Sequence, residues 1–236
     1  DRALDEHITL TPWSLALSWP EDQPMTELPR SAQGLIIHRM LTRSLNHLID
    51  DERDRRRVGD HVERLRVLWS AHKRGRLELP LGLRAWGGQG HLKIYAPNRI
   101  PSPPHTLQVD GVGLYRWGPW RVELSYAEGT EGVALPALPL QWTLRRPWTG
   151  ARFHPAGAGG SKRVRRLWSD RKYPPFERDT LPVLCDERDR IIWVPGCPIS
   201  QRFHLESTRA LEADPKHPRV QLSVSALCVD AEEAEE

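Results

Sequence analysis

The stretch GGSKRVRRLWSDRKYPPFERDTLPVL, residues 159–184, decides how the second half of the chain folds. Its apolar residues Val164, Leu167 and Trp168 stand at i, i+3 and i+4, a spacing that predicts a short helix with one buried side. Ser161 is predicted to cap the start of this helix, directly after the glycine turn. The prolines at 174 and 175 end the helix, and LPVLC at residues 181–185 predicts a buried strand.

The predicted helix is strongly basic. Between Lys162 and Lys172 the chain has six bases and one acid, so the local charge of +5 exceeds the formal +3 of all 236 residues. Arginine's planar fork suits phosphate oxygens, and the free N–H groups at a helix start also favour phosphate. Several phosphates at a fixed pitch fit this surface better than one small anion does. The alternative is a merely solvated basic helix. The predicted nucleic-acid-binding residues of this segment are Lys162, Arg163, Arg165, Arg166, Lys172 and Arg178.

Working outward, the pattern predicts an α+β protein: a helical domain with a β-hairpin and a small sheet, then a small mixed α/β C-terminal domain. Prolines in ALPALPL, residues 134–140, place the expected boundary near residue 138. The expected domains are residues 1–138 and 139–229, followed by a disordered acidic tail at 230–236. Strands are expected at TLQVD, RVELSYA, LQWTLRR, LPVLC, IIWVPG and, with one wet face, RVQLSVSALCV.

Two helices are expected between residues 26 and 76. The first has Ile37, Leu41, Leu45 and Leu48 on one face, with Ser31 as its N-cap and Leu28 packing back onto it. The second starts at Asp60, has Glu63 in capping-box position and ends at Gly75. Its buried stripe is expected to be Val62, Leu65 and Trp69. Strands follow from Arg76, and GGQG at residues 87–90 predicts a hairpin turn.

The motifs for common chemistries are absent from this sequence. GAGGSK at residues 157–162 lacks the glycine that a Walker loop has before its lysine, and Glu177 and Asp179 fit ion pairing better than acid–base catalysis. We therefore predict no catalytic residue. The ten histidines show no metal-ligand clustering, so no metal site is expected either. Cys185, Cys197 and Cys228 lack a C-x-x-C pair and are expected to be buried thiols in a reducing cytoplasm.

The N-terminal sequence and the length of the apolar runs indicate in which cellular compartment the protein is expected. No apolar run approaches the roughly 18 residues of a membrane span. The acidic start DRALDEHITLTPW is not a signal peptide, and it lacks an initiator methionine. A cytoplasmic fragment of a longer protein is therefore the expectation, without a membrane partner.

The segment GSKRVRRLWSDRKYPPFERDTLPVLCDERDRIIWVPG, residues 160–196, resembles the C-terminal domain of bacterial tRNA(Ile)-lysidine synthetase. It shares that family's glycine turn, basic helix with a large apolar pair, prolines with an aromatic, and RD-x-x-P-L/V-L run. Upstream, TLRRPWTGARF is similar to the family's RRPGDRF lead-in, which adds Arg145, Arg146 and Arg152 to the predicted tRNA-binding residues. Ala151 departs from the family, because an aspartate is usual there. The resemblance is strong over residues 141–196 and looser before them, where it extends to the family's helical middle domain.

The resemblance implies a role in an ATP-dependent ligase that attaches lysine to the wobble cytidine of tRNA(Ile) with a CAU anticodon. The family's N-terminal PP-loop domain carries that chemistry on an SGGxDS motif, which this sequence does not contain. The chain would bind the tRNA body and acceptor stem, while ATP, Mg²⁺ and lysine would bind the absent domain; no cofactor is expected in this chain. A homodimer is compatible with this expectation. The alternatives are a free-standing RNA-binding or adaptor module and a structural protein whose basic helix binds nothing.

Overall fold

The computed structural model of the chain describes residues 8–11, 13–18, 27–48, 61–71, 73–88, 91–127, 133–134 and 141–226. The described residues fall into two compact units, one ending at Ile100 and the other covering Pro101–Ala226. Each unit has its own hydrophobic core. Both units combine helices with antiparallel sheets, which confirms the predicted α+β class.

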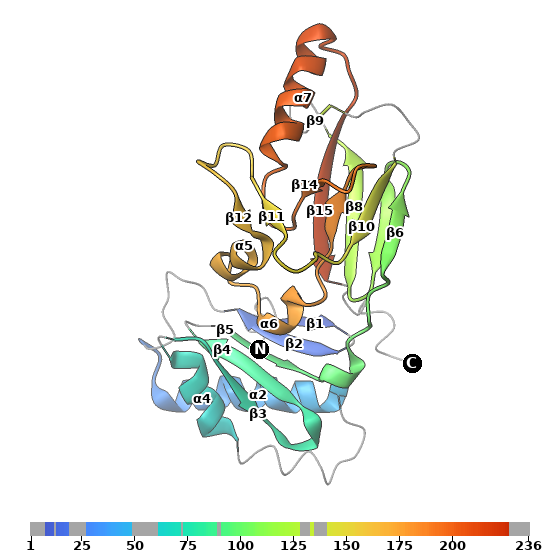
Figure 1. Cartoon of the computed structure of the whole chain (residues 1–236). Helices are drawn as coiled ribbons and strands as arrows, with labels where there is room; N and C mark the ends of the chain where they lie inside the picture. Colours follow the sequence, from blue (N-terminus) through green and yellow to red (C-terminus); the bar gives the residue numbers. More distant parts are fainter. Residues whose placement is uncertain are drawn as a thin grey trace. The chain divides into compact units, whose positions relative to one another are not determined.

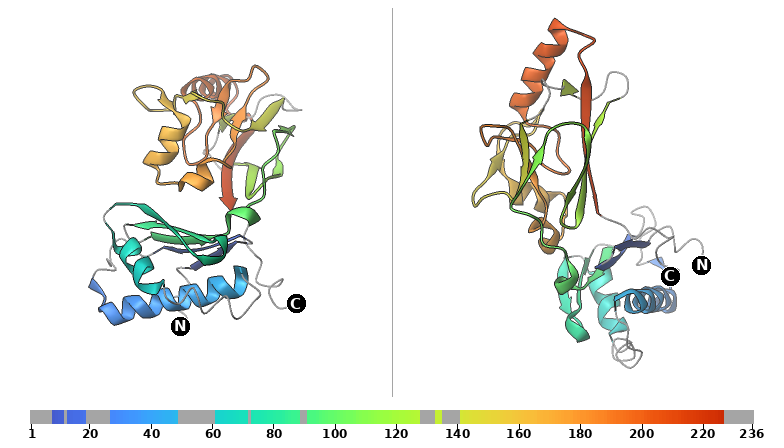
Figure 2. Two further views of the ribbon diagram at one scale, coloured as in Figure 1. Left: turned by 60° about the horizontal axis from the view of Figure 1, so that its bottom comes forward. Right: turned by 90° about the vertical axis from the view of Figure 1, so that its right-hand side faces the viewer.

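The first unit is an antiparallel sheet with two helices on one of its faces (Figure 2). The strand order is β1-β2-β5-β4-β3. Short 3₁₀ turns occupy Pro80–Gly82 and Pro97–Arg99. The strands and helices are β1 (Ile8–Thr11), β2 (Ser14–Ser18), α2 (Arg30–Leu48), α4 (Val62–Ser70), β3 (Gly75–Glu78), β4 (Arg84–Gly88) and β5 (His91–Tyr95).

The apolar periodicity of the two helices is confirmed. Ile37, Leu41 and Leu48 of α2 and Leu65 and Trp69 of α4 are buried against alternate residues of the strands. Val62 and Leu28 pack at the edge of the same core. The hairpin predicted at GGQG is also confirmed, because Gly88 and His91 are cross-strand partners in β4 and β5. The side chain of Leu45 lies outside the described part.

The predicted ends of these helices are wrong. Helix α2 begins at Arg30, so Ser31 is inside it rather than at its cap. Helix α4 ends at Ser70, and Gly75 begins strand β3 instead of ending the helix. Asp60 lies outside the described residues, and His61, at the N-cap position of α4, makes no side-chain cap. The sequence also did not predict β1 and β2.

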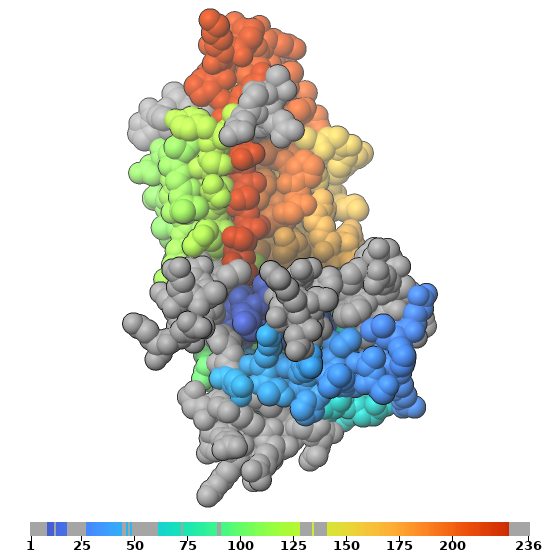
Figure 3. Space-filling view, turned by 180° about the vertical axis from the view of Figure 1, so that it is seen from behind, coloured from blue at the N-terminus to red at the C-terminus, as the bar shows by residue number. Residues whose placement is uncertain are grey.

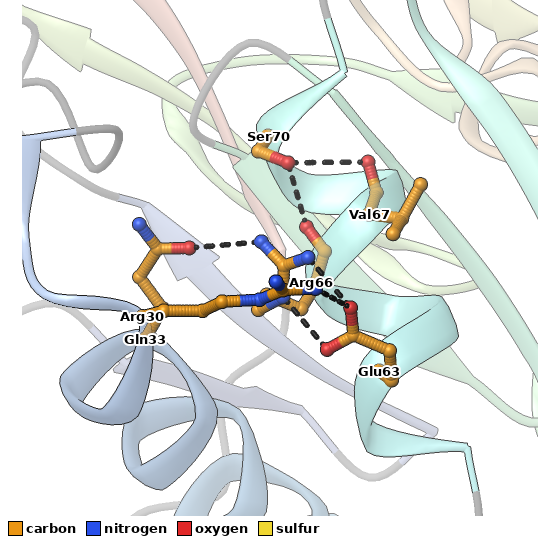
Figure 4. A network of polar contacts seen from close by, with 6 residues as sticks. All are labelled: Arg30, Gln33, Glu63, Arg66, Val67 and Ser70. Atoms are coloured by element: carbon orange, nitrogen blue, oxygen red, sulfur yellow. Dashed lines mark hydrogen bonds and ion pairs between the residues drawn. The ribbon is translucent and has the colours of Figure 1, made fainter.

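Glu63 has a different role from the predicted capping box: it joins the two helices (Figure 4). Arg30 of α2 donates to its Oε1 at 2.8 Å, and Arg66 of α4 donates to both carboxylate oxygens at 2.8 and 2.6 Å. Hydrogen bonds from Arg66 and Arg30 lower the pKa of Glu63 to about 2. Arg66 also donates to Gln33 Oε1 at 3.3 Å, and Gln33 in turn donates to the Leu28 carbonyl at 2.9 Å.

The second unit packs two four-stranded sheets and three helices around one core (Figure 1). The sheet orders are β14-β13-β10-β6 and β7-β8-β15-β9, and β11 pairs with β12 alone. The strands are β6 (Thr106–Val109), β7 (Gly113–Trp117), β8 (Trp120–Tyr126), β9 (Val133–Ala134), β10 (Trp142–Arg145), β11 (Arg152–Phe153), β12 (Lys162–Arg163), β13 (Val183–Cys185), β14 (Ile191–Trp193) and β15 (Arg219–Ala226). The helices are α5 (Val164–Asp170), α6 (Pro175–Arg178) and α7 (Gln201–Ala213).

The division of the chain differs from the boundary expected near residue 138. Strands β6, β7 and β8 belong to the second unit, because β6 pairs with β10 and β8 pairs along its whole length with β15. The space-filling view shows β15 in red beside the green β7–β8 hairpin (Figure 3). Strand β15 has the predicted alternation, with Val220 buried and Gln221 exposed. The expected tail at 230–236 lies outside the described residues.

Thr180 connects the β7–β8 hairpin to the segment that follows α6. The indole N–H of Trp117 donates to the Thr180 carbonyl at 2.9 Å, and that of Trp120 donates to the Thr180 hydroxyl at 3.0 Å. Cys185 and Cys197 are buried free thiols, as expected, and burial raises the pKa of Cys185 to about 12. Cys228 is not among the described residues.

Candidate nucleic-acid interface

Helix α5 presents arginines on one side because its other side is buried. Val164, Leu167 and Trp168 are buried in the core of the second unit, as predicted. The indole N–H of Trp168 donates to the Pro195 carbonyl at 3.3 Å. Arg165 and Arg166 are therefore held on the outer side, where their side chains are about three-quarters exposed (74% and 72%).

The start of α5 is not the free anion site that the sequence predicted. Lys162 and Arg163 form strand β12, paired with Phe153 and Arg152 of β11, so the helix begins only at Val164. The Val164 N–H donates to the Ala151 carbonyl at 2.9 Å. Ser161 makes no helix cap. Two cationic residues thus enter the site from a strand rather than from a helix.

Ser161 instead anchors the two strands to each other. Its hydroxyl and carbonyl both accept hydrogen bonds from Arg152, at 3.1 and 2.7 Å. Ala151 stands where the family usually has an aspartate. It is 4% exposed, and its backbone carbonyl accepts the hydrogen bond from the Val164 N–H at the start of α5. The guanidinium of Arg152 therefore already donates two hydrogen bonds to Ser161, the residue just before strand β12.

A cavity of about 500 Å³ opens between the β10–β11 connection and the start of α5. We call it the cationic groove. Three of the predicted residues, Arg163, Arg165 and Arg166, come together in it from β12 and α5. Gly150 has a left-handed φ of +80° at the turn opposite them, a conformation that glycine adopts without strain. The groove is lined by Pro147, Trp148, Thr149, Gly150, Ala151, Arg163, Val164, Arg165 and Arg166.

Acidic residues accompany some of these cations. Asp170 lies 3.0 Å from Arg166 Nε and 3.4 Å from Lys162 Nζ, and Asp179 lies 2.7 Å from Arg165 Nη2. The ion pairing predicted for Asp179 is confirmed. Exposed pairs of this kind are worth about 0–1 kcal/mol each, so a phosphate can replace the carboxylate at little cost.

Arg163 differs from its neighbours because no ion pair or side-chain hydrogen bond holds it within the part of the chain that the structure describes. It is exposed on β12 and lines the cationic groove. Its guanidinium can therefore bind an anion without first leaving a partner.

The other predicted residues lie outside the groove. Arg145 pairs with Asp189 at 2.6 Å, and Arg146 donates to the Ser102 hydroxyl and the Pro103 carbonyl, both at 3.1 Å. Lys172 is exposed with φ +67° after α5. Arg178 is half-buried, and its buried Nε has no hydrogen-bond partner among the described residues. Their binding roles stay predictions.

Sequence reasoning missed Trp148. This residue is 45% exposed, more than any other tryptophan among the described residues. The guanidinium carbon of Arg145 lies 5.5 Å from the centre of its ring. No sequence signal separates this tryptophan from the buried ones, because PWTG has no apolar periodicity to place it.

Trp148 also lines a second cavity, of about 570 Å³, which we call the apolar cavity. Ile191, Ile192, Phe203 and Leu205 contribute its apolar surface, and acidic and basic side chains surround them. One of these, Asp186, accepts from Arg190 Nε at 2.6 Å; burial raises the pKa of this carboxyl, but the bonds from Arg190 and Arg188 outweigh it and leave the pKa lowered. The cavity begins beside α7, whose N-cap Ser200 accepts from the Phe203 N–H at 3.2 Å.

Within the described ranges, histidine, cysteine and acidic side chains form no cluster that could hold a metal ion. None of the helices described is both long and apolar enough to cross a membrane.

Comparison with known proteins identifies the part of the chain that contains the cationic groove. The family model described as "TilS substrate C-terminal domain" matches residues 142–213. The tRNA(Ile)-lysidine synthase of Oceanobacillus iheyensis is 30% identical over 134 residues, which are 51% of this chain and 28% of that protein. The synthase of Shouchella clausii is 34% identical over 109 residues, or 44% of this chain and 21% of that protein.

A solved crystal structure of a TilS C-terminal domain also matches, with 22% identity and a TM-score of 0.37, covering 52% of this chain and 99% of that one. The chain matches less than a third of the length of its curated relatives. Residues 142–213 are thus similar to the TilS substrate C-terminal domain, and the resemblance of this chain to the C-terminal region of tRNA(Ile)-lysidine synthases is confirmed.

Proposed function

We propose that this chain is the tRNA-recognition portion of a tRNA(Ile)-lysidine synthase and that it binds the body and acceptor stem of tRNA(Ile) with a CAU anticodon. The observation that carries this proposal is the cationic groove, whose three arginines lie within the matched residues 142–213. The ligation of lysine to the wobble cytidine, with its ATP, Mg²⁺ and lysine, takes place on another domain of the enzyme, and this chain alone is not catalytic.

Double-helical RNA explains why the site consists of arginines rather than of base-reading groups. The deep groove of A-form RNA is closed to side chains, so proteins contact mainly phosphates and 2′-hydroxyls across the shallow groove. Arginine binds phosphate through two parallel hydrogen bonds, and such bonds are stronger than neutral ones. Arg163, Arg165 and Arg166 are exposed and close together, which suits consecutive phosphates of one strand.

Fluorescence anisotropy tests the proposal. The chain is titrated into labelled tRNA(Ile) with the CAU anticodon, and into a methionine tRNA with the same anticodon, at several salt concentrations. The plot of log K against log salt has a negative slope, and each lost phosphate contact makes this slope shallower by roughly 0.7–0.9. Arg163→Gln should show this loss, whereas Arg209→Gln, an exposed arginine of α7 outside the groove, should not.

The two tRNAs separate the outcomes. Tighter binding of tRNA(Ile) means that discriminating contacts lie on this chain. Equal and steeply salt-dependent binding of both tRNAs means that the chain contacts phosphates without regard to sequence. The catalytic domain would then discriminate between the two tRNAs. Absence of binding to both tRNAs at low salt contradicts the proposal.

A further inference from the structure

An exposed tryptophan stands where two chemically different cavities meet. Trp148 lines both the cationic groove and the apolar cavity. It follows β10 and precedes β11, within the matched domain. Trp148 is 45% exposed, so its ring is accessible to a ligand at the place where the two cavities meet.

The ring of Trp148 contacts a cation. Arg145 Cζ lies 5.5 Å from the ring centre, within the range of a cation–π contact. Arg145 in turn pairs with Asp189 through Nη1 at 2.6 Å. The indole therefore has an ion-paired guanidinium as its neighbour, and Trp148 stays 45% exposed.

The two cavities suit different parts of a nucleotide. Arg163, Arg165 and Arg166 give the cationic groove a positive wall, which attracts phosphate. The apolar cavity has Ile192, Phe203 and Leu205 in its wall, and its charged lining is balanced, with three acids and three arginines. Its carboxylates are paired with arginines but keep oxygens that can accept from the amino groups of a base. Its volume of about 570 Å³ is in the range of small-ligand sites.

We propose that Trp148 stacks on an unpaired RNA base whose flanking phosphates lie in the cationic groove, so that the base turns away from the strand toward the apolar cavity. This inference rests on the proposed RNA binding and adds the structural feature that is recognised: a single-stranded nucleotide next to a duplex. Stacking on an aromatic side chain contributes about 1–3 kcal/mol per base and depends little on which base is present.

The test uses the whole chain and two RNA probes: a blunt duplex and the same duplex with a short single-stranded adenosine overhang. Trp148→Leu keeps apolar bulk but removes the stacking ring, and Trp148→Phe keeps a smaller ring. Tyr126→Leu is the matched control, because Tyr126 is 55% exposed on β8 and is not among the residues that line either cavity. Thermal melts check that each variant is folded.

Stacking predicts that Trp148→Leu weakens binding of the overhang duplex about tenfold, Trp148→Phe weakens it less, and neither changes binding of the blunt duplex. Equal losses for both duplexes, or no loss for either, overturn the inference while leaving the proposed RNA binding in place. If the unaltered chain binds neither duplex nor tRNA, the proposed function fails and this inference fails with it.

Discussion

Asp170 shows how single residues set the strength of the candidate site. Its carboxylate lies between Lys162 and Arg166, at 3.4 and 3.0 Å, and is itself 34% exposed. It therefore occupies two cations that would otherwise face a phosphate. Because exposed pairs are weak, this competition moderates RNA binding without preventing it.

Replacing that carboxylate should strengthen binding. Asp170→Asn leaves Lys162 and Arg166 without their acidic partner, so we expect RNA affinity to rise about two- to fivefold at low salt, which corresponds to about 0.5–1 kcal/mol. Anisotropy titration of tRNA measures the change. Glu212→Gln, an exposed acid of α7 outside the groove, controls for net charge. Equal effects of the two substitutions would show that only overall charge matters.

At this scale the sequence predicted buried faces better than local roles. Val164, Leu167 and Trp168 were placed correctly, because apolar spacing reports directly on which side of a helix is buried. Ser161 was misplaced because Lys162 and Arg163 pair with a strand that starts ten residues earlier, and a local pattern does not contain that pairing. Trp148 was not singled out, because PWTG has no apolar periodicity that would place its ring.

Among the elements, the contact between α2 and α4 depends on one carboxylate. Glu63 accepts from Arg30 across the helix pair and from Arg66 within α4. Its pKa is lowered to about 2 from 4.5, so the charged form is the one that the folded chain favours. The stabilisation is present above pH 4.5 and is lost as the pH falls toward 2.

Glu63→Gln should therefore lower the melting temperature slightly at neutral pH, because it removes the negative charge from both arginines. The gap between variant and parent should close as the pH falls from 4.5 to about 2. Circular dichroism melts across this range measure it. A gap that stays constant would mean that the glutamate acts through packing and not through its charge. Glu78→Gln is a control, because this exposed glutamate of strand β3 also pairs with two arginines, Arg76 and Arg84, but does not join α2 to α4.

The elements that were missed depend on partners that are distant in sequence. Helix α7, QRFHLESTRALEA, was not predicted although it is amphipathic, and Ser207 is its one buried residue. The serine is buried because its hydroxyl accepts from the Ala134 N–H of β9 at 2.6 Å. Strands β1 and β2 are short and separated by two residues. Pairing with β5 stabilises them, and that partner is distant in sequence.

At the scale of the whole molecule, the chain has two cores without a common residue. Leu65 belongs to the first and Leu184 to the second, and both are fully buried. The sequence divided the chain near residue 138 because prolines there are typical of a connector. Only the pairing of β6 and β8 with later strands shows that the division lies at Ile100.

Separate cores predict separate unfolding. Leu65→Ala and Leu184→Ala each remove buried methyl groups and should each cost about 2–5 kcal/mol, but in different transitions. Scanning calorimetry should show Leu65→Ala lowering one transition and Leu184→Ala the other. A single transition that both substitutions shift by the same amount would show that the two units unfold together.

The pairing of β10 with β6 determines which residues must be included when this domain is expressed separately. The family match begins at Trp142, whose strand partner is Val109. A fragment limited to residues 142–213 would expose the unpaired edge of β10 and remove the indole partners of Thr180. Open strand edges recruit other chains, so such a fragment is prone to aggregate. Expression of residues 101–226 keeps every described strand of the second unit paired.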